Sequence, residues 1–345
     1  MSLELSYYNT AAHICRKIYD EIKGKILLEF REAVDDKVTK LDILPLLEYG
    51  NNRILEETST LFKKSKKTKG IASPISITTN NTVLYYTYDH ESPLNNNNYI
   101  TENDIVKINL SVTINDCIAN LCETFCIIEN KPINKIIKFL DKISCEIVDN
   151  IEPGEVNDEI RILIESKCTE KGVFPIENCM SFQQMEKHNK FDESKFLILN
   201  YKKKYDSNDD LINYENLCFE FSPNEVYTID ISVVQIDDSD DKIIYKKLEP
   251  SHLYRINDYQ YSLKLKSSKL FYNNVKSKHN NYLFDLQEYK NITTNKFGIN
   301  ECLKHGILEE YPIMYVTQNG KPLNVITKRF TIFVTEDSCK MLKYN

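Results

Sequence analysis

The sequence lacks the features of a disulfide-stabilised, zinc-stabilised or membrane-spanning protein. Its ten cysteines are scattered singly, without a Cys-x-x-Cys pair or a close Cys/His cluster, so we expect neither a disulfide framework nor a structural zinc site. No apolar run approaches the roughly 18–20 residues that a membrane span requires. The N-terminus has no basic segment followed by an apolar one, so we expect no signal peptide. These absences predict a cytoplasmic protein, with the nucleus and nucleolus as further locations and no membrane partner.

Charge is unevenly distributed along the chain. The formal net charge of −7 argues against a uniformly basic nucleic-acid-binding protein. Lysine is nevertheless concentrated in LFKKSKKTKG (61–70) and between residues 245 and 280, where eight basic residues stand against two acidic ones. Such segments are either a solvated face of the fold or contacts to RNA phosphates. The candidate RNA- and ribosome-contacting residues are Lys63, Lys64, Lys66, Lys67, Lys246, Lys247, Lys264, Lys266, Lys269, Lys276 and Lys278.

Apolar residues at helical spacing predict several amphipathic helices. Isoleucine recurs every fourth residue over 14–26, which is one stripe of a helix. Residues 45–67 predict a second helix, whose last turns would carry the first lysine run. Another apolar stripe covers 133–143. A further helix is expected to begin with Asn157 or Asp158 as its N-cap.

A β-hairpin is predicted in the middle of the first half. Residues 106–114 alternate strictly between apolar and polar side chains, which is typical of a half-buried strand. The pair at 115–116 then predicts a turn, and 117–128 the returning strand. With a two-residue loop, Asn109 and Asn120 lie on the same face of the hairpin as diagonal neighbours.

Other segments predict a loop, further strands and a basic insertion. The polar run 95–98 predicts an exposed loop tip. Residues 226–233 and 330–334 predict strands, and a basic, Tyr-rich, partly helical stretch lies between them. The order of these elements predicts an α+β fold with an antiparallel sheet. We expect one domain formed by residues 1–246 and 313–345, and an insertion subdomain at 247–312.

Several segments resemble one protein family in the order in which they occur. They include GIASPISITTNN (70–81), HESPL (90–94), YITENDIVKINLSVTINDCIANLCETF (99–125), NEVYTIDISV (224–233) and YSLKLKSSKLFY (261–272). Together they resemble the type 2 methionine aminopeptidases, and most of all the non-peptidase branch, the proliferation-associated, ErbB-receptor-binding proteins. The resemblance implies the pita-bread fold, with a central antiparallel sheet flanked by helices and a helical insertion in the C-terminal half.

The residues that match the family's metal ligands are mostly not metal-binding residue types in this chain. In the peptidases two Asp, one His and two Glu bind two metal ions. Neutral amides are poor substitutes for carboxylates, and an arginine places a fixed cation beside the metal positions. We therefore expect no metal, no cofactor and no metal-activated water for peptide hydrolysis. The matching positions in this chain are Asn109, Asn120, Phe182, Asp230 and Arg329.

Two histidines and one charged pair are further candidates at this site. His90 and His188 match histidines that line the peptidase cleft. Without a metal they are either remnants that line the cleft or part of a residual peptide-binding groove. Asp230 and Arg329 are expected to form an ion pair that joins the two halves where metal ions do so in the peptidases.

The resemblance implies a binding protein rather than an enzyme. Proteins of the non-peptidase branch bind the large ribosomal subunit near the peptide exit tunnel, ribosomal RNA and regulatory proteins. We therefore expect a monomeric, catalytically inactive protein with a role in translation or ribosome biogenesis and in growth regulation. One alternative is a scaffold that binds only proteins. The other is a divergent metallo-aminopeptidase, for which Asp116 in the turn and Glu123 on the opposite face are poorly placed.

Overall fold

The computed structural model describes residues 3–32, 40–63, 67–177, 179–184, 195–200, 218–236, 243–257, 261–290 and 296–344. Its helices are α1 (Leu3–Glu32), α2 (Leu44–Thr60), α3 (Lys131–Asn150), α4 (Asn157–Lys171), α5 (Lys266–His279), α6 (Gln287–Lys290) and α7 (Lys296–Lys304), with a 3-10 turn at Asn96–Asn98. The strands are β1 (Leu41–Asp42), β2 (Lys69–Thr79), β3 (Tyr99–Ile100), β4 (Ile105–Ile114), β5 (Cys117–Cys126), β6 (Val173–Pro175), β7 (Cys179–Gln183), β8 (Phe196–Leu199), β9 (Val226–Gln235), β10 (Ile243–Ile256), β11 (Phe284–Asp285), β12 (Leu308–Gln318), β13 (Lys321–Pro322), β14 (Val325–Val334) and β15 (Cys339–Met341).

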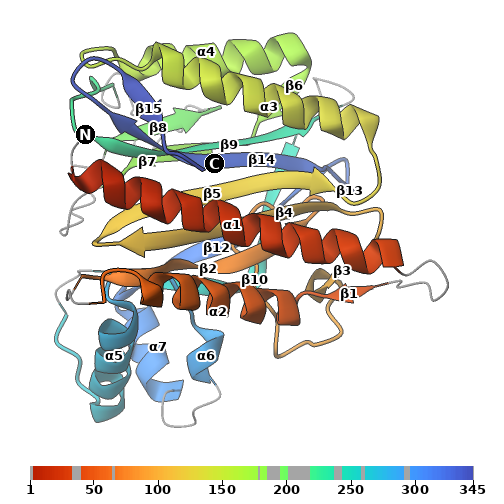
Figure 1. Cartoon of the computed structure of the whole chain (residues 1–345). Helices are drawn as coiled ribbons and strands as arrows, with labels where there is room; N and C mark the ends of the chain where they lie inside the picture. The colour runs from red at the N-terminus through yellow and green to blue at the C-terminus, as the bar shows by residue number, and fades with distance from the viewer. Residues whose placement is uncertain are drawn as a thin grey trace, which may run out of the picture.

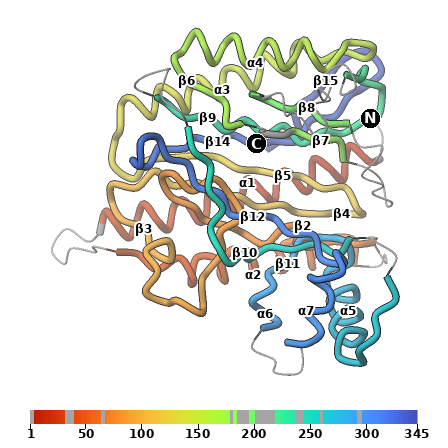
Figure 2. Tube along the Cα trace, turned by 180° about the vertical axis from the view of Figure 1, so that it is seen from behind, coloured from red at the N-terminus to blue at the C-terminus, as the bar shows by residue number. Residues whose placement is uncertain are grey.

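The centre of the molecule is a nine-stranded sheet with the order β2-β4-β5-β14-β9-β7-β8, in which β15 flanks β14 and β6 flanks β9. All of its strand pairs are antiparallel. Helices α1, α3 and α4 lie along one side of the sheet (Figure 1). A second sheet, β11-β10-β12-β13, lies over the opposite face, where Figure 2 shows β10 and β12 from behind. The predicted α+β class is confirmed.

The predicted helical stripe at the N-terminus forms the main contact between helix and sheet. Ile14, Ile18, Ile22 and Ile26 all lie in the buried core with strands β4 and β5. Their spacing of four residues puts them on one face of α1, so the whole stripe is removed from water at once. The stripe at 133–143 does the same for α3, whose Ile136, Leu140 and Ile143 are buried. Both predictions are confirmed.

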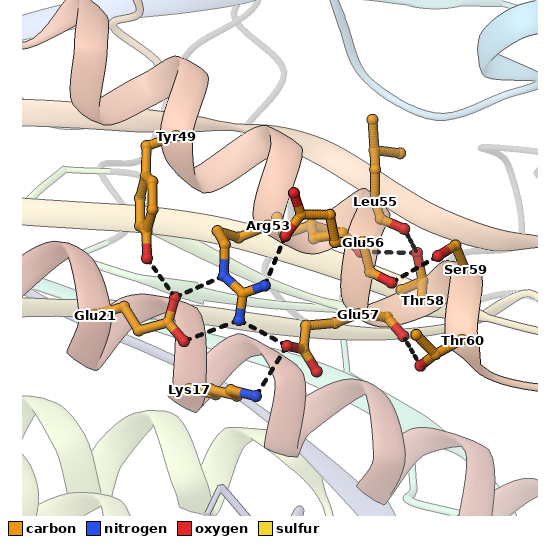
Figure 3. Close-up of polar contacts among 11 residues, drawn as sticks. Lys17, Glu21, Tyr49, Arg53, Leu55, Glu56, Glu57, Thr58, Ser59 and Thr60 are labelled. Atoms are coloured by element: carbon orange, nitrogen blue, oxygen red, sulfur yellow. Dashed lines mark hydrogen bonds and ion pairs between the residues drawn. The ribbon is translucent and has the colours of Figure 1, made fainter.

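Helix α2 ends at Thr60, so the prediction that its last turns carry the lysine run is wrong. The next residue, Leu61, is extended, and Phe62 has a φ of 46°, which breaks the helical hydrogen-bond ladder. The hydroxyls of Ser59 and Thr60 turn back and donate hydrogen bonds to the backbone carbonyl oxygens of Glu56 and Glu57, each at 2.7 Å (Figure 3). Serine and threonine side chains of this kind compete with the helical backbone.

The predicted hairpin and its register are confirmed. Asn115 and Asp116 have φ values of 55° and 65°, as a two-residue hairpin turn with positive φ at both positions requires. Ser111 is therefore paired with Asn120 and Asn109 with Cys122. Asparagine and aspartate tolerate this left-handed conformation better than most residues, which is why this dipeptide can set the register.

Strand β4 is not half-buried as predicted, because both of its faces are covered. Its apolar face packs against α1, and on the other side of the sheet lie β10 and β12 (Figure 2). Thr113, for example, shares a hydrogen bond of 3.1 Å with the hydroxyl of Tyr282. Lys107 is fully buried, its amine donates to the carbonyl of Asn80 at 2.9 Å, and burial lowers the pKa of Lys107 to about 7.

Two asparagines have roles that differ from those predicted. The N-cap of α4 is Val156, and Asn157 instead accepts from the backbone N–H of Phe219 at 2.9 Å. Asn98, expected at an exposed loop tip, is completely buried. Its side-chain oxygen accepts from the Tyr86 hydroxyl at 2.7 Å and from a backbone N–H, and its amide donates to three carbonyls of the loop. A buried amide that is fully satisfied in this way fixes the loop conformation.

The stretch 247–312 contains helices α5, α6 and α7 and has an apolar core of its own. Phe271, Val275, Phe284 and Cys302 are fully buried in this core. Strands β10 and β12, which hold the stretch at both ends, extend beyond the expected limits of the insertion, so its boundaries stay a prediction. None of the helices in the described part of the chain combines the length and apolar character needed to cross a membrane.

Candidate functional site

Four strands bring the candidate metal-site residues together in one row. Asn109 on β4 is paired with Cys122 on β5, Cys122 with Arg329 on β14, and Arg329 with Asp230 on β9. Asn120 lies two residues from Cys122 and therefore on the same face of the sheet. The structure thus gathers residues that are more than 200 positions apart in the chain, for example Asn109 and Arg329.

Arg329 and Asp230 form a buried ion pair, as predicted. The Arg329 Nε donates to Oδ2 of Asp230 at 2.9 Å, and Nη2 donates to the same oxygen. Nη1 reaches the side-chain oxygen of Asn109 at 3.4 Å. Burial works against the charged guanidinium, but the oxygens of Asp230 and Tyr85 outweigh it and raise the pKa of Arg329. The cation is therefore permanently charged and held in place by neighbouring oxygens.

Tyr85 covers this ion pair and was not singled out from the sequence. Its hydroxyl accepts from Nη2 of Arg329 at 2.9 Å, and its ring lies edge-on to Tyr311 of β12, with centroids 5.4 Å apart. The φ of Tyr85 is 69°, which is unusual for a bulky residue and is maintained by these contacts. Burial raises the pKa of the Tyr85 hydroxyl. No periodicity marks this residue, because it lies in a loop between strands.

The second asparagine of the row is committed to a hydrogen-bond network. The side-chain oxygen of Asn120 accepts from the Ser111 hydroxyl at 2.5 Å, and its amide donates to the Thr228 hydroxyl at 2.9 Å. Gln184 donates to the same threonine oxygen at 3.0 Å. All the groups of this network are neutral, so it directs no anionic oxygen at a metal position.

A pair of divalent metal ions does not fit these residues. The row offers one carboxylate, and that carboxylate is neutralised by Arg329. At an effective dielectric constant of about 20, each carboxylate lost near a divalent ion costs several kcal/mol of attraction. Across the described residues, no three His, Cys, Asp or Glu side chains gather as a set of metal ligands.

The two acids considered for a divergent metal site point elsewhere. Asp116 accepts from the Thr68 hydroxyl at 2.7 Å and from the Tyr282 hydroxyl at 2.8 Å. Glu123 lies on the helix-covered face, as predicted, and binds Arg16 of α1 and Lys328 of β14. Burial alone would raise the pKa of Glu123, but the two cations outweigh it and lower the pKa to about 2.

Of the other candidate cleft residues, the structure places only some near this row. Phe182 on β7 is half-buried and paired with Thr228, next to the Asn120 network. His90 is exposed; its ring packs on Tyr88 at 4.9 Å, and its backbone N–H donates to Gln287 of the insertion at 3.1 Å. His188 lies outside the described residues.

A buried polar cluster between the loop before β3 and the insertion was also not predicted from the sequence. The Thr87 hydroxyl lies 2.5 Å from Oδ2 of Asp285 and 3.0 Å from Nδ1 of His252. Burial raises the pKa of Asp285 to about 6 and lowers the pKa of His252 to about 4. Isolated His and Asp residues give no pattern in the sequence, so only the fold could show this contact.

The first group of candidate lysines is dispersed. Lys63 is exposed just beyond α2, and Lys67 packs over the ring of Tyr7 at 3.9 Å. Lys246 is exposed on β10, whereas Lys247 pairs with two glutamates at 2.7 and 2.8 Å. Lys64 and Lys66 lie outside the described residues.

The lysines of α5 divide into two sets. Near its C-terminus Lys278 pairs with Glu288 at 2.7 Å, and Lys276 contacts the Asn281 side chain. At its N-terminus Lys264, Lys266 and Lys269 are exposed, and within the described chain no acidic side chain forms an ion pair with them. These three are the candidate lysines best placed for an external anionic partner.

The chain was compared with known proteins by sequence. No protein-family model matches it. It is 27% identical over 304 residues to ErbB-3 binding protein 1 of Arabidopsis thaliana, covering 86% of this chain and 71% of the relative. It is 25% identical over 336 residues to the curved DNA-binding protein of Schizosaccharomyces pombe, covering 92% and 84%. Proliferation-associated protein A of Dictyostelium discoideum is 26% identical over 282 residues, covering 79% and 68%.

Solved structures with the same fold were also found. A thermophilic Arx1 superposes with a TM-score of 0.76 at 18% identity, covering 99% of this chain and 91% of the other. A methionine aminopeptidase from Thermotoga maritima superposes with a TM-score of 0.54 at 12% identity, covering 99% and 97%. The expected resemblance and the expected fold are confirmed. The chain is similar in sequence to ErbB-3-binding and proliferation-associated proteins, and it has the pita-bread fold of the methionine aminopeptidases.

Proposed function

We propose that this protein is a catalytically inactive member of the aminopeptidase fold that binds the large ribosomal subunit and its RNA near the peptide exit tunnel. Its role would lie in translation or ribosome biogenesis and, through this, in growth regulation. The proposal covers a monomer in the cytoplasm, with a further pool in the nucleus or nucleolus. The observation that carries it is the buried ion pair between Arg329 and Asp230 at the centre of the former catalytic face.

The ion pair argues against peptide hydrolysis on electrostatic grounds. A metallopeptidase needs anionic ligands that hold the metal and lower the pKa of its bound water. Here Arg329 supplies a fixed positive charge, Asp230 is neutralised by it, and Tyr85 covers both. Restoring a metal would require removing the guanidinium and adding carboxylates at the same place. The fold is therefore retained as a scaffold for binding.

The basic end of α5 supports contact with RNA. Lys264, Lys266 and Lys269 extend into solvent around the first turn of the helix, where the helix dipole also favours anions. Phosphate contacts from flexible lysines give affinity without sequence selectivity, which suits a large folded RNA surface. One relative is named a curved DNA-binding protein, which is consistent with phosphate recognition on this fold.

Co-sedimentation with purified large ribosomal subunits across a salt series tests the proposal. Wild-type protein should pellet with the subunits at low salt and be released as the salt concentration rises. Lys264→Glu/Lys266→Glu/Lys269→Glu should abolish pelleting. The matched control is Lys131→Glu/Lys135→Glu/Lys138→Glu, which reverses three exposed charges on α3, at the other end of the molecule in Figure 1. No pelleting of the wild type, or equal loss with both variants, would refute the proposed docking face.

A scaffold that binds only proteins is the second candidate function. The observation that favours it is the relative named ErbB-3 binding protein 1, whose name describes a protein partner. Partner binding that is insensitive to both salt and nuclease would support this candidate over the first.

A further inference from the structure

The loop before β3 is held against the insertion at Thr87. Thr87 and His252 of β10 are buried, and Asp285 of β11 is partly buried beside them. Strands β10 and β11 are paired, with Leu253 opposite Asp285, so the sheet of the insertion fixes where the imidazole and the carboxyl lie. We call Thr87, His252 and Asp285 the Thr87 cluster. It joins segments that are distant in the chain, since Thr87 and His252 are 165 residues apart.

The hydrogen bonds of the Thr87 cluster fix which ring nitrogen of His252 carries a proton. The backbone N–H of Thr87 donates to Nδ1 of His252 at 3.3 Å, so Nδ1 is an acceptor and the neutral ring carries its proton on Nε2. Burial disfavours the charged imidazole and lowers the pKa of His252 to about 4. Nδ1 of His252 therefore has no proton to give to the Thr87 hydroxyl.

The two contacts of the Thr87 hydroxyl require two protons. Its oxygen lies 3.0 Å from Nδ1 of His252 and 2.5 Å from Oδ2 of Asp285. A hydroxyl has one proton, so when it donates to Nδ1 the proton of the 2.5 Å contact must come from the carboxyl. Oδ1 of Asp285 accepts from the backbone N–H of Gln287 at 2.8 Å, which leaves Oδ2 to hold that proton. A protonated carboxyl therefore satisfies every contact of the cluster.

Loss of this proton makes one of the contacts unfavourable. The Asp285 carboxylate then takes the hydroxyl proton of Thr87, and the hydroxyl oxygen faces Nδ1 of His252 at 3.0 Å with lone pairs on both atoms. The loop has to move away from β10 to relieve this repulsion. Burial raises the pKa of the Asp285 carboxyl to about 6, so the proton is lost between about pH 5 and pH 7.

Other titratable groups surround the Thr87 cluster and have to be distinguished from it. Lys290 of α6 pairs with Glu91 of the loop at 3.2 Å, so these two charges largely offset each other. Histidine is the side chain that ordinarily changes charge between pH 5 and pH 8, so the exposed His90 needs a control of its own. The titratable or charged groups that lie against His252 or Asp285 are Tyr86, Asp89, His90, Glu91, Glu288 and Lys290.

We propose that a proton bound between Asp285 and Thr87 holds the loop on the insertion, and that loss of this proton as the pH rises loosens the loop. The loop also carries Tyr85, which covers Arg329, so the same proton regulates how tightly the central ion pair is covered. Gln287 still donates to the carbonyl of Tyr88 at 2.9 Å, so the loop loosens locally and does not detach. The inference does not depend on ribosome binding.

The test is hydrogen–deuterium exchange of the full chain near pH 5 and near pH 7.5, measured by mass spectrometry on peptides that cover residues 84–91. Rates are divided by those of unstructured peptides of the same sequence, which removes the direct effect of pH on exchange. Opening of the wild-type loop should increase about tenfold between the two pH values. This is the change required by a carboxyl whose pKa is about 6 in the cluster and 3.8 outside it.

Asp285→Asn places an amide N–H where Oδ2 carries its proton, so this variant should keep the loop equally protected at both pH values. His90→Gln is the matched control, because it removes the other group of the loop that titrates in this range; it should keep the tenfold change. Peptides from α1 are the internal reference and should exchange alike in all three proteins. Wild-type protection that does not change with pH, the same change in Asp285→Asn, or its loss in His90→Gln would overturn the inference.

Discussion

The Arg329 side chain shows how a buried cation is stabilised within a sheet. Its guanidinium is almost completely removed from water, and a buried pair gains little over apolar residues of similar volume because desolvation offsets the attraction. Removing one partner is different, since the other charge then remains buried and uncompensated. Its hydrogen bonds to Asp230, Asn109 and Tyr85 therefore decide whether this part of the sheet is stable.

Arg329→Ala should lower the free energy of unfolding by about 3–5 kcal/mol, because Asp230 is then buried without its partner. Arg329→Ala/Asp230→Ala should cost less than the sum of the two single substitutions. Urea unfolding of the four proteins of this double-mutant cycle measures the coupling energy. Additive losses would show that the pair does not act as a unit.

A second prediction at the scale of single residues follows from the raised pKa of Asp285. Its carboxyl is protonated more readily in the folded protein than when unfolded, so its contribution to stability is present at low pH and is lost as the pH rises through about 6. Asp285→Asn should therefore be the more stable protein at pH 8, by about 2 kcal/mol, and lose that advantage near pH 4.

Thermal unfolding of wild type and Asp285→Asn between pH 4 and pH 8 measures this difference. A difference that stays constant across this range would contradict the assigned role of Asp285.

At the scale of helices and strands, ion pairs that hold the helices in place contribute unequally to the free energy of unfolding. Glu123 of β5 joins Arg16 of α1 to Lys328 of β14 in a largely buried contact. Arg53 of α2 contacts Glu21 of α1 and Glu57, whose carboxylates are somewhat more exposed than that of Glu123 (Figure 3). Exposed pairs contribute about 0–1 kcal/mol each, so the first contact should matter more than the second.

Glu123→Gln should destabilise the protein by about 2–3 kcal/mol at pH 7, because two cations lose their anionic partner. The folded pKa of Glu123 is about 2, below its ordinary value of 4.5. Its stabilising effect is therefore complete above about pH 4.5 and is lost as the pH falls toward 2. Chemical unfolding at both ends of this window checks the sign, and Arg53→Met serves as a control whose cost should stay near 1 kcal/mol or less.

The positions of helices and strands could be predicted where the sequence pattern depends only on nearby residues. The stripes of α1 and α3 depend on helical periodicity, and the β4–β5 register depends on the Asn115–Asp116 turn. The end of α2 was not predictable, because short-range bonds of Ser59 and Thr60 compete with a helical pattern that continues into the lysines. The N-cap of α4 was missed because Asn157 binds a backbone group 62 residues away.

At the scale of the whole molecule, the insertion is joined to the loop before β3 by a hydrogen bond and an ion pair. Gln287 donates to the carbonyl of Tyr88 at 2.9 Å, and Lys290 pairs with Glu91 at 3.2 Å. The formal net charge is −7, yet the tip of the insertion is basic. Such polarity orients the molecule toward an anionic surface during encounter and should make association salt-dependent.

A whole-molecule prediction concerns metal content. Protein purified in the presence of Co²⁺ or Mn²⁺ and then desalted should contain far less than one metal ion per chain, because the central row carries almost no net negative charge. Elemental analysis by mass spectrometry measures this directly, with a sample treated with a chelator as the reference. Stoichiometric metal would revive a divergent aminopeptidase and contradict the proposed loss of the site.

The sequence by itself determined the buried stripes of α1 and α3, the β4–β5 hairpin with its register, and the residue types at the positions that match the metal ligands, because these depend on local chain geometry and on matching short segments. Tertiary structure alone decided that Tyr85 covers Arg329, that Asn98 and Lys107 are buried, and which lysines of α5 remain free of acidic partners. The physical reason is separation along the chain. Tyr85 and Arg329 are 244 residues apart, and no periodicity or turn signal relates two side chains over that distance until the sheet has formed.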